Sequence, residues 1–452
     1  MIICWEMKGR TIDSKTVNID TVRRYVMLVF SVLFLLVMFN TSALAQEQRF
    51  PRPEFDSGYE QPNVIQPAPR SPYMEYVDLF VLIVVLSFAT WLVIKKRSRR
   101  MIFWTSVFSL AYFGFFREGC ICPVGSLQNV VLALVDPTYA LPLTVLLFFL
   151  IPLVTTLFFG RTFCAAVCPL GAIQDIVAFK PLELPKWLQK TLGLIPYLYL
   201  GLAVLYAATK TDFLICRYDP FVGIFRFDAQ FEMLLLGGLL LLIGVFVARP
   251  YCRFLCPYGV LLGWMSAFSK KHLTITPSEC IQCKLCVNSC PFGAINEPVA
   301  ETGKRRTGVK RLLNYLMIIP FWMVIGGLAG SLLHVPLAKF NKTVYLAEQI
   351  VGTPEVLEDL DNIDVQTFLQ SEESIDELVL RAESILSDFY WGGWILGAFM
   401  GLVIGLTLVK LSVHRGRKDY EPDKVNCLSC GRCIDYCPVK ESNGNDGSNI
   451  KK

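Results

Sequence analysis

This chain of 452 residues contains one spacing of cysteines twice, and the repeat constrains its fold more than any other feature. Each copy has four cysteines separated by two, two and three residues, and each ends in Cys-Pro. The copies are Cys280, Cys283, Cys286 and Cys290, and Cys427, Cys430, Cys433 and Cys437. In a run of this kind three thiolates ligate one [4Fe–4S] cluster, and the fourth ligates the cluster of the other run. The two copies must therefore meet in the folded protein.

Crossed ligation divides the eight cysteines into two predicted sets. One set is Cys280, Cys283, Cys286 and Cys437, and the other is Cys427, Cys430, Cys433 and Cys290. Thiolates suit this role because they are soft, anionic donors. Zinc sites or disulfides are the alternatives, but tight spacing that recurs in this form is typical of cluster ligands. No catalytic side chain is predicted, because the clusters themselves carry the redox chemistry.

The composition predicts a membrane protein. Hydrophobic residues make up 54% of the chain, charged residues only 18%, and the mean hydropathy is +0.47, as in polytopic membrane proteins. Seven apolar stretches lie near 77–94, 101–116, 140–159, 194–209, 231–248, 312–333 and 391–411. A bilayer crossing takes about 20 apolar residues. We therefore expect an all-α polytopic fold with about seven transmembrane helices.

The segment before these stretches has two parts. Residues 1–45 contain Arg23-Arg24, an apolar run and then Ala43-Leu44-Ala45, which predicts a signal peptide or an uncleaved signal anchor. Residues 46–75 are rich in proline and have no apolar period. They are predicted to form an extended outer linker.

Charge predicts how the chain crosses the bacterial cytoplasmic membrane. If every stretch crosses, the basic loops, such as 95–100, fall on one side, which the positive-inside rule assigns to the cytoplasm. These short clusters argue against nucleic-acid binding. Acidic residues 334–390 fall on the outer side, where a capping box at Ser374–Glu377 predicts a helical cap. Two crossings separate the ferredoxin runs, so both are predicted to be cytoplasmic.

The predicted domains follow from this topology. A five-span membrane domain with Cys-Pro repeats occupies 76–270. A split two-cluster ferredoxin module is formed by 271–311 and 412–452. The sixth span (312–333), the outer cap (334–390) and the seventh span (391–411) lie between the two halves of that module.

A second pattern of cysteines follows arginines at the ends of apolar stretches. Cys164 and Cys168, like Cys252 and Cys256, have the form Arg-x2-Cys-x3-Cys-Pro-x-Gly. All four are predicted at cytoplasmic ends of spans, where they hold a further iron–sulfur or metal centre or act as redox-active dithiols. Buried structural cysteines are the alternative.

Three more cysteines, Cys120, Cys122 and Cys216, are predicted on the outer side. Arg117 and Cys-Pro-x-Gly make the first two a shortened relative of the same pattern. The three thiols form an outer redox site or, alternatively, a disulfide, because that compartment is oxidising in bacteria. The arginines of the pattern either stabilise thiolate or cluster charge or anchor the spans to lipid headgroups.

Several cofactor classes have no support. The chain has three histidines, all in predicted loops or at span ends, which argues against a haem held by two histidines inside the bundle. No G-x-G-x-x-G follows a strand-like segment, and no phosphate-binding P-loop is present. Nicotinamide dehydrogenases and ATPases are therefore not indicated.

Together the two Cys-x3-Cys-Pro pairs and the two ferredoxin runs resemble the membrane polyferredoxins of the NosR and NapH type, over roughly residues 77–440. The resemblance implies electron transfer between a quinol pool or an outer flavoprotein and iron–sulfur clusters in a respiratory chain. NosR-type members carry an outer flavin-binding domain before the spans, for which residues 46–75 are too short. Flavin is therefore expected only through a partner, such as an outer FMN-binding protein.

The sequence thus predicts an electron carrier or oxidoreductase subunit. It would pass electrons between an outer-face, quinol or flavoprotein partner and two cytoplasmic [4Fe–4S] clusters. A hydrocarbon core of about 30 Å is too thick for one efficient electron transfer, which is why intermediate centres are expected. The alternatives are a quinol dehydrogenase subunit and a redox-sensing or assembly factor for a respiratory metalloenzyme.

Overall fold

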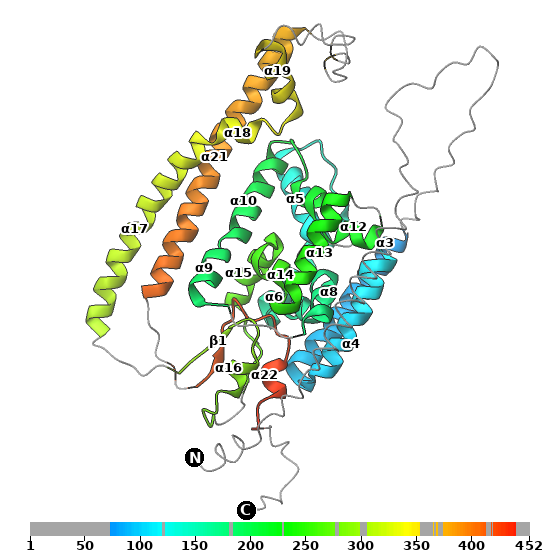
Figure 1. Cartoon of the computed structure of the whole chain (residues 1–452), viewed down its shortest axis with the longest axis vertical. Coiled ribbons are helices and arrows are strands. Elements are labelled where there is room, and N and C mark those ends of the chain that lie inside the picture. Colours follow the sequence, from blue (N-terminus) through cyan, green and yellow to red (C-terminus); the bar gives the residue numbers. More distant parts are fainter. Residues whose placement is uncertain are drawn as a thin grey trace, which may run out of the picture.

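The computed structural model describes residues 73–119, 123–179, 184–227, 230–275, 280–298, 305–352, 365, 368, 374–412, 417 and 419–439. The described part is almost wholly helical and contains one two-stranded sheet. Figure 1 shows the two ferredoxin runs at one end of a helical bundle and helices α18 (His334–Ala338) and α19 (Lys342–Gly352) at the other. The predicted signal segment and nearly all of the predicted linker lie outside the described residues.

The first five apolar stretches form the helices of the bundle. The first two pass from α-helix into π-helix, and a short helix and a turn precede the fourth. The elements are α3 (Tyr73–Trp91) with η2 (Leu92–Lys96), α4 (Arg99–Ser109) with η3 (Leu110–Phe116), α6 (Leu143–Phe159), α9 (Lys186–Leu192) with α10 (Ile195–Ala208), and α13 (Phe231–Phe246). Most of their buried apolar side chains belong to one core that also contacts the cysteine loops, while Leu205 and Tyr206 of α10 pack with α18, α19 and α21 (Ile375–Ser412).

Short helices that the sequence analysis did not predict fill the space between these elements. They are α5 (Pro123–Val135), α7 (Thr162–Ala166), α8 (Pro169–Val177), α11 (Leu214–Tyr218), α12 (Val222–Arg226), α14 (Pro250–Phe254) and α15 (Pro257–Ala267). Proline opens α8 and α15 because its fixed φ suits the first helical position and its missing N–H is not needed there. Since α15 packs against α6 and α10, the Cys-Pro loops are packed within the bundle.

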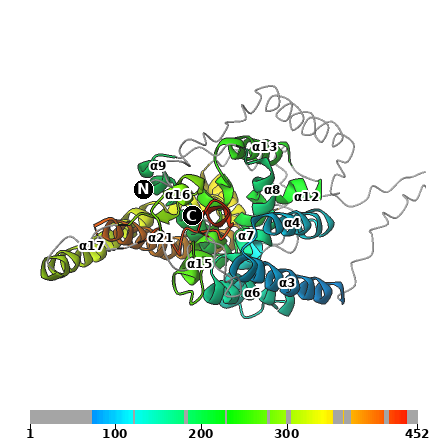
Figure 2. The ribbon, with the colours of Figure 1, turned by 90° about the horizontal axis from the view of Figure 1, so that it is seen from below.

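The last two apolar stretches form a hairpin of α17 (Arg305–Leu332) and α21 (Ile375–Ser412), which Figure 2 shows side by side at one edge of the molecule. Glycines let the two backbones touch. A Cβ atom at Gly326 would collide with the carbonyl of Gly397, and one at Gly330 with that of Gly393. Such small-residue spacing is a recurrent way to pack helices in membranes, where lipid gives no hydrophobic drive between helices.

The cap predicted for 334–390 is part of this hairpin. Helix α21 runs without a break through the predicted cap helix and the seventh span, and its 38 residues measure about 57 Å. The predicted capping box is confirmed: the Glu377 N–H donates to Ser374 Oγ (3.3 Å), and the Ser374 N–H donates to the Glu377 carboxylate (3.4 Å). The Tyr206 hydroxyl donates to the Leu337 carbonyl (3.0 Å), which ties the cap to α10. Most of 353–373 lies outside the described residues.

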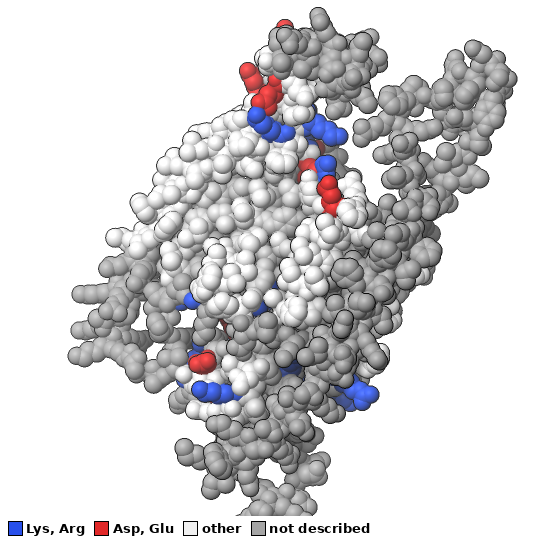
Figure 3. All heavy atoms as spheres, in the orientation of Figure 1, with Lys and Arg blue, Asp and Glu red and all other residues white. Residues whose placement is uncertain are grey.

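Three helical segments of the described chain are long and apolar enough to cross a membrane: Tyr73–Lys96, Trp187–Ala208 and Ile375–Lys410. Shorter apolar helices are Pro123–Val135, Leu143–Phe159, Phe231–Phe246 and Leu316–Leu332. Figure 3 shows a broad band of uncharged side chains between charged groups at the two ends of the visible face. The chain is thus a mostly helical, multi-pass membrane protein, while the number of seven crossings stays a prediction.

Candidate metal centres

The two ferredoxin runs come together although more than a hundred residues separate them. Strands β1 (Ile295–Asn296) and β2 (Glu421–Pro422) pair antiparallel, with Ile295 opposite Pro422. Helix α16 (Leu285–Ser289), in the first run, packs against α22 (Arg432–Asp435), in the second. The halves therefore form one module, as crossed ligation requires.

Each run folds into the same loop. The residues on either side of the second cysteine have positive φ in both copies: Gln282 (+52°) and Lys284 (+61°) in the first, Ser429 (+54°) and Gly431 (+77°) in the second. Three of these four positions carry a side chain in the left-handed region, which costs energy for any residue except glycine. A strained backbone repeated at matching positions indicates that the loop shape itself is required.

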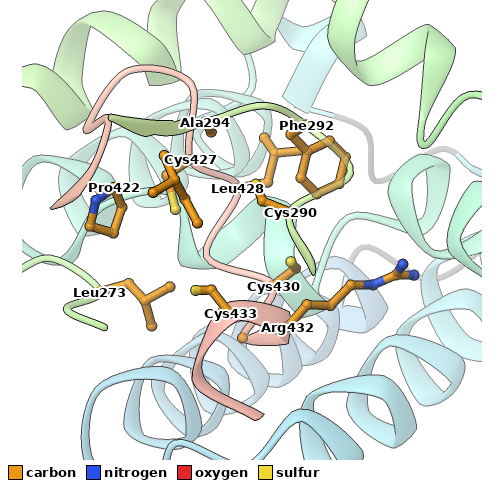
Figure 4. Close-up of a pocket in the computed structure, with 12 residues that line it drawn as sticks. Leu273, Cys290, Phe292, Ala294, Pro422, Cys427, Leu428, Cys430, Arg432 and Cys433 are labelled. Carbon is orange, nitrogen blue, oxygen red and sulfur yellow. The ribbon is translucent and has the colours of Figure 1, made fainter. Parts of the chain in front are cut away.

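The cysteines gather in the crossed arrangement. Cys290 joins Cys427, Cys430 and Cys433 around one cavity, which is shown in Figure 4. Around a second cavity, Cys437 joins Cys280, Cys283 and Cys286. Each group takes three thiols from one run and the fourth from the other.

The surroundings of these thiols fit an iron–sulfur cluster. Burial raises the pKa of Cys286 to about 11 and that of Cys427 to about 12, so both thiols keep their protons at neutral pH until a metal displaces them. The Ser429 N–H donates to Cys427 Sγ (3.4 Å). Among the described residues, no three Cys, His, Asp or Glu side chains are spaced to hold a single metal ion. Each thiolate of a [4Fe–4S] cluster binds a different iron, so a wider spacing is expected.

Arginines of the helical bundle hold this module by its backbone carbonyls. The donor–acceptor pairs are Arg97 with Thr274 and Ile275 (3.2 Å to the latter), Arg99 with Cys430 (3.1 Å), Arg161 with Val425 (3.0 Å), and Arg253 with Pro291 (3.5 Å) and Phe292 (2.9 Å). A guanidinium presents five donors in a rigid fork, so one side chain can satisfy several carbonyls. Both cavities are thereby fixed against the bundle.

The Cys-x3-Cys-Pro pairs occupy matching places in the bundle. Cys164 lies in α7 and Cys168 directly precedes α8, while Cys252 lies in α14 and Cys256 directly precedes α15. All four pack against the main core and are only partly exposed. The structure thus brings two predicted pairs into one region, next to the ferredoxin module.

The arginines before these cysteines are buried, which argues against one of their two predicted roles, the anchoring to lipid headgroups. Arg117 and Arg161 are each 7% exposed and Arg249 is 1% exposed. Arg249 makes a two-pronged contact with Asp175 (3.1 and 2.9 Å), and Arg117 pairs with Asp78 (2.5 Å). Side chains enclosed by protein in this way do not reach lipid headgroups. Arg117 and Arg249 instead neutralise buried aspartates, and a role of these arginines toward thiolate or cluster charge stays a prediction.

A glutamine side chain holds the backbone before Cys216 in the same way as the backbone before Cys252. Gln174, six residues after Cys168, accepts the N–H of Tyr251, which precedes Cys252 (3.0 Å). Gln128, six residues after Cys122, accepts the N–H of Ile215, which precedes Cys216 (2.8 Å). The sequence analysis missed these glutamines, although their equal spacing from Cys-Pro was a readable signal.

The predicted outer trio is therefore only partly visible. Cys216 is not in a disulfide, and its Sγ lies 3.2 Å from the place of a Cβ at Gly125. Cys120 and Cys122 lie outside the described residues. Whether the three thiols form a redox site stays a prediction.

Comparison with protein families supports iron–sulfur binding. A family model described as a 4Fe-4S binding domain matches residues 141–194, 229–276 and 286–310, and a second model of that description matches 273–296. These matches include both Cys-x3-Cys-Pro pairs and the first ferredoxin run. No solved structure matches this chain.

Several curated proteins are similar to this chain. YccM of Escherichia coli K12 is 28% identical over 37% of this chain and 52% of its own length. Regulatory protein NosR of Stutzerimonas stutzeri is 27% identical over 42% of this chain and 28% of NosR, and Protein NirI of Paracoccus denitrificans is 28% identical over 31% and 22%. The matches thus span about half of these relatives or less. The chain is a membrane protein with 4Fe-4S ferredoxin domains and is related to NosR, NirI and YccM.

Proposed function

We propose that this protein conducts electrons across the bacterial cytoplasmic membrane, between an outer-face, quinol or flavoprotein partner and two [4Fe–4S] clusters on the cytoplasmic side. The observation that carries the proposal is the pair of crossed four-cysteine groups docked on a helical membrane bundle. YccM, a relative, is named for electron transport. When bound, each cluster supplies a site that accepts and releases one electron.

The protein's own part is to hold and shield these sites. Cys427, Cys430 and Cys433 are each less than 10% exposed, so water is largely kept from their sulfur atoms. Arg99 donates to the Cys430 carbonyl and also contacts Asp175 of α8 (3.2 Å). The cluster-binding loop is thus connected directly to the interior of the bundle.

The orientation is part of the proposal. The arginines that hold the ferredoxin module lie at the end of the bundle that the positive-inside rule assigns to the cytoplasm. The cap of α18 and α19 lies at the opposite end (Figure 1). Accessibility of cysteines introduced at exposed Lys342 and at exposed Asp419 to a membrane-impermeant maleimide tests this orientation, since only the former should react in intact cells.

Liposomes test the conduit directly. Purified protein is inserted with a reductant outside and an impermeant dye acceptor inside, and the dye should be reduced only when the protein is present. A variant lacking Cys283 and Cys430 is the matched control, because it removes one ligand from each crossed group. Protein that fills with iron yet reduces no dye would contradict the conduit.

That result would favour a redox-sensing or assembly factor, a role consistent with the name of the relative NosR, a regulatory protein. A quinol dehydrogenase is the remaining candidate. It is favoured by a cavity of about 860 Å³ between α9–α10 and the ferredoxin module, lined by Tyr197, Pro196 and Val260 among others. Dye reduction that depends on added quinol would identify this activity.

A further inference from the structure

The two Cys-x3-Cys-Pro loops exchange arginines. Arg249, which opens the second loop, donates to the carbonyl of Cys164 in the first loop and to that of Ala165 (3.4 Å). A Cβ atom at Gly171 would lie 3.2 Å from the same guanidinium. Arg249 therefore fills the space beside the first loop, although it belongs to the second.

Arg161, which opens the first loop, takes the equivalent place in the second. A Cβ atom at Gly259 would lie 3.2 Å from its guanidinium and 3.5 Å from the carbonyl oxygen of Cys252. The distance from Gly171 to the Cys164 carbonyl is also 3.5 Å. The two loops are thus halves of one pseudo-twofold unit that surrounds four cysteines.

The two exchanged arginines differ in whether a carboxylate neutralises them. Asp175, seven residues after Cys168, neutralises Arg249, whereas the residue seven positions after Cys256 is Gly263. Among the described residues no carboxylate forms an ion pair with Arg161. Its Nε is buried and has no hydrogen-bond partner. A cation that is 93% buried without an anion is costly, so this position indicates a missing negative charge.

The cysteines are placed to supply that charge. Arg161, Cys252 and Cys256 line the same cavity of about 860 Å³. Cys164 lies close enough to Cys252 for their thiols to interact electrostatically. Cys168 and Cys256 occupy equivalent positions as the residues before α8 and α15. Cys252 and Cys256 therefore adjoin a buried cation that lacks an ion pair, and the same pseudo-twofold unit brings Cys164 near Cys252 and places Cys168 at the position equivalent to Cys256.

The neighbouring ferredoxin site indicates what the thiols hold. Phe292, Ile295 and Leu428 line both this cavity and the pocket of Cys290, Cys427, Cys430 and Cys433. One layer of side chains thus separates the two. The four thiols, like those of the ferredoxin module, are not spaced for a single ion.

We propose that Cys164, Cys168, Cys252 and Cys256 bind a third redox centre, an anionic iron–sulfur cluster whose charge is balanced by Arg161. The proposal rests on the proposed function, because it supplies an electron-transfer site inside the membrane bundle. One electron passes from this centre in its reduced state to the adjacent ferredoxin site in its oxidised state. No bond forms or breaks, and the membrane-side donor of the conduit is the reductant.

Iron and acid-labile sulfide per chain, measured on the full-length protein purified without oxygen, test the proposal. Two [4Fe–4S] clusters account for about eight iron atoms, so wild type should exceed eight. Cys252→Ser with Cys256→Ser should lose only the excess and keep the electron paramagnetic resonance of the ferredoxin pair, which also shows that the variant folds. Iron content that stays unchanged in this variant, or zinc at these thiols, would overturn the proposal.

Arg161 gives a second readout that keeps all cysteines. Arg161→Gln should retain the iron of the third centre but lower its midpoint potential in a redox titration, because a positive charge favours the reduced, more negative state. Arg161→Lys should restore most of the shift. A potential that does not move in Arg161→Gln would count against the counter-ion role. Loss of dye reduction in liposomes with iron above eight would instead contradict the conduit and leave the third centre standing.

Discussion

The molecule contains two repeated pairs of cysteine loops, and they are joined in opposite ways. In the ferredoxin module the halves exchange a cysteine, since Cys290 and Cys437 each join the other half's group. In the bundle the halves exchange a cation, since Arg161 and Arg249 each lie beside the other loop. A module of short loops has little core of its own, so the cluster ligands that we propose its halves share would stabilise it. A helical bundle already has a core, and its repeats instead share buried charge.

The exchange of ligands should give the largest effect. Cys290→Ser should remove the cluster of Cys427, Cys430 and Cys433, whereas Cys437→Ser should remove that of Cys280, Cys283 and Cys286. Each variant should lose about four iron atoms per chain. Iron analysis and spectra of each variant combined with Cys430→Ser check the assignment. If the crossed assignment is right, the double variant of Cys290→Ser and Cys430→Ser contains as much iron as Cys430→Ser alone, because both residues belong to one site. The double variant of Cys437→Ser and Cys430→Ser should lose iron from both sites.

The hairpin that brings the two halves together gives the next effect. Gly397→Leu would place a side chain against the Gly326 carbonyl, where a Cβ atom alone already collides, so α17 and α21 must separate. We expect a reduced iron content at both ferredoxin sites, measured on protein from isolated membranes. Gly352→Leu is the matched control, because nothing lies within 4 Å of a Cβ there. Equal iron in the two variants would show that the module assembles without the hairpin.

The exchange of cations should be costly to break. Arg249→Leu leaves Asp175 buried with Arg99 as its one ion-pair partner among the described residues, and should lower the free energy of unfolding by about 3 kcal/mol. Arg217→Leu removes an arginine from an exposed pair with Asp212 and should cost less than about 1 kcal/mol. Thermal unfolding in detergent compares the two. Similar losses would mean that the Arg249 pair contributes no more than a surface ion pair.

The stability of the contact between the bundle and the ferredoxin module should depend on pH through His272. Burial, together with the nearby Lys424, lowers the pKa of His272 from 6.5 to about 4, and both ring nitrogens lack partners. Because the pKa of His272 is lower in the folded protein than in the unfolded chain, the free energy of unfolding has its full value above pH 6.5. It decreases as the pH drops toward 4. The loss at pH 5 is about 2 kcal/mol. His272→Phe should show a smaller difference between its unfolding temperatures at pH 7 and pH 5 than wild type, and an unchanged difference would exclude this source.

The ferredoxin half of this comparison could be anticipated from sequence. The spacing of Cys280–Cys290 and Cys427–Cys437 predicts which thiols meet, because crossed ligation is a property of the loop and needs no knowledge of the surrounding fold. The capping box at Ser374 was equally local and is confirmed. The sequence did not show that the cap helix and the seventh span form one continuous helix. Periodicity does not show where such a helix leaves the bilayer, so the division of residues 334–411 into a cap and a span stays a prediction.

The bundle half could not be anticipated in the same way. Helices such as α8 and α15 have 9 and 11 residues, too few to give a span signal. The burial of Arg161 and Arg249 depends on Gly259 and Gly171, which lie on the opposite loop in each case. A motif records which residue types recur, but not which copy each side chain contacts. Gln128 and Gln174 show the same limit, because their partners lie in other segments.

The separation of the two ferredoxin halves along the chain also orders the protein's biosynthesis. When residues 280–290 have left the ribosome, neither site has all its ligands, because one lacks Cys437 and the other lacks three cysteines. The missing thiols follow only after α17, the cap and α21 have been translated. Cluster insertion into both sites can therefore be completed only in a chain whose last two helices have been made. If both sites bind clusters, iron at both of them would be found only in molecules whose synthesis has passed residue 437.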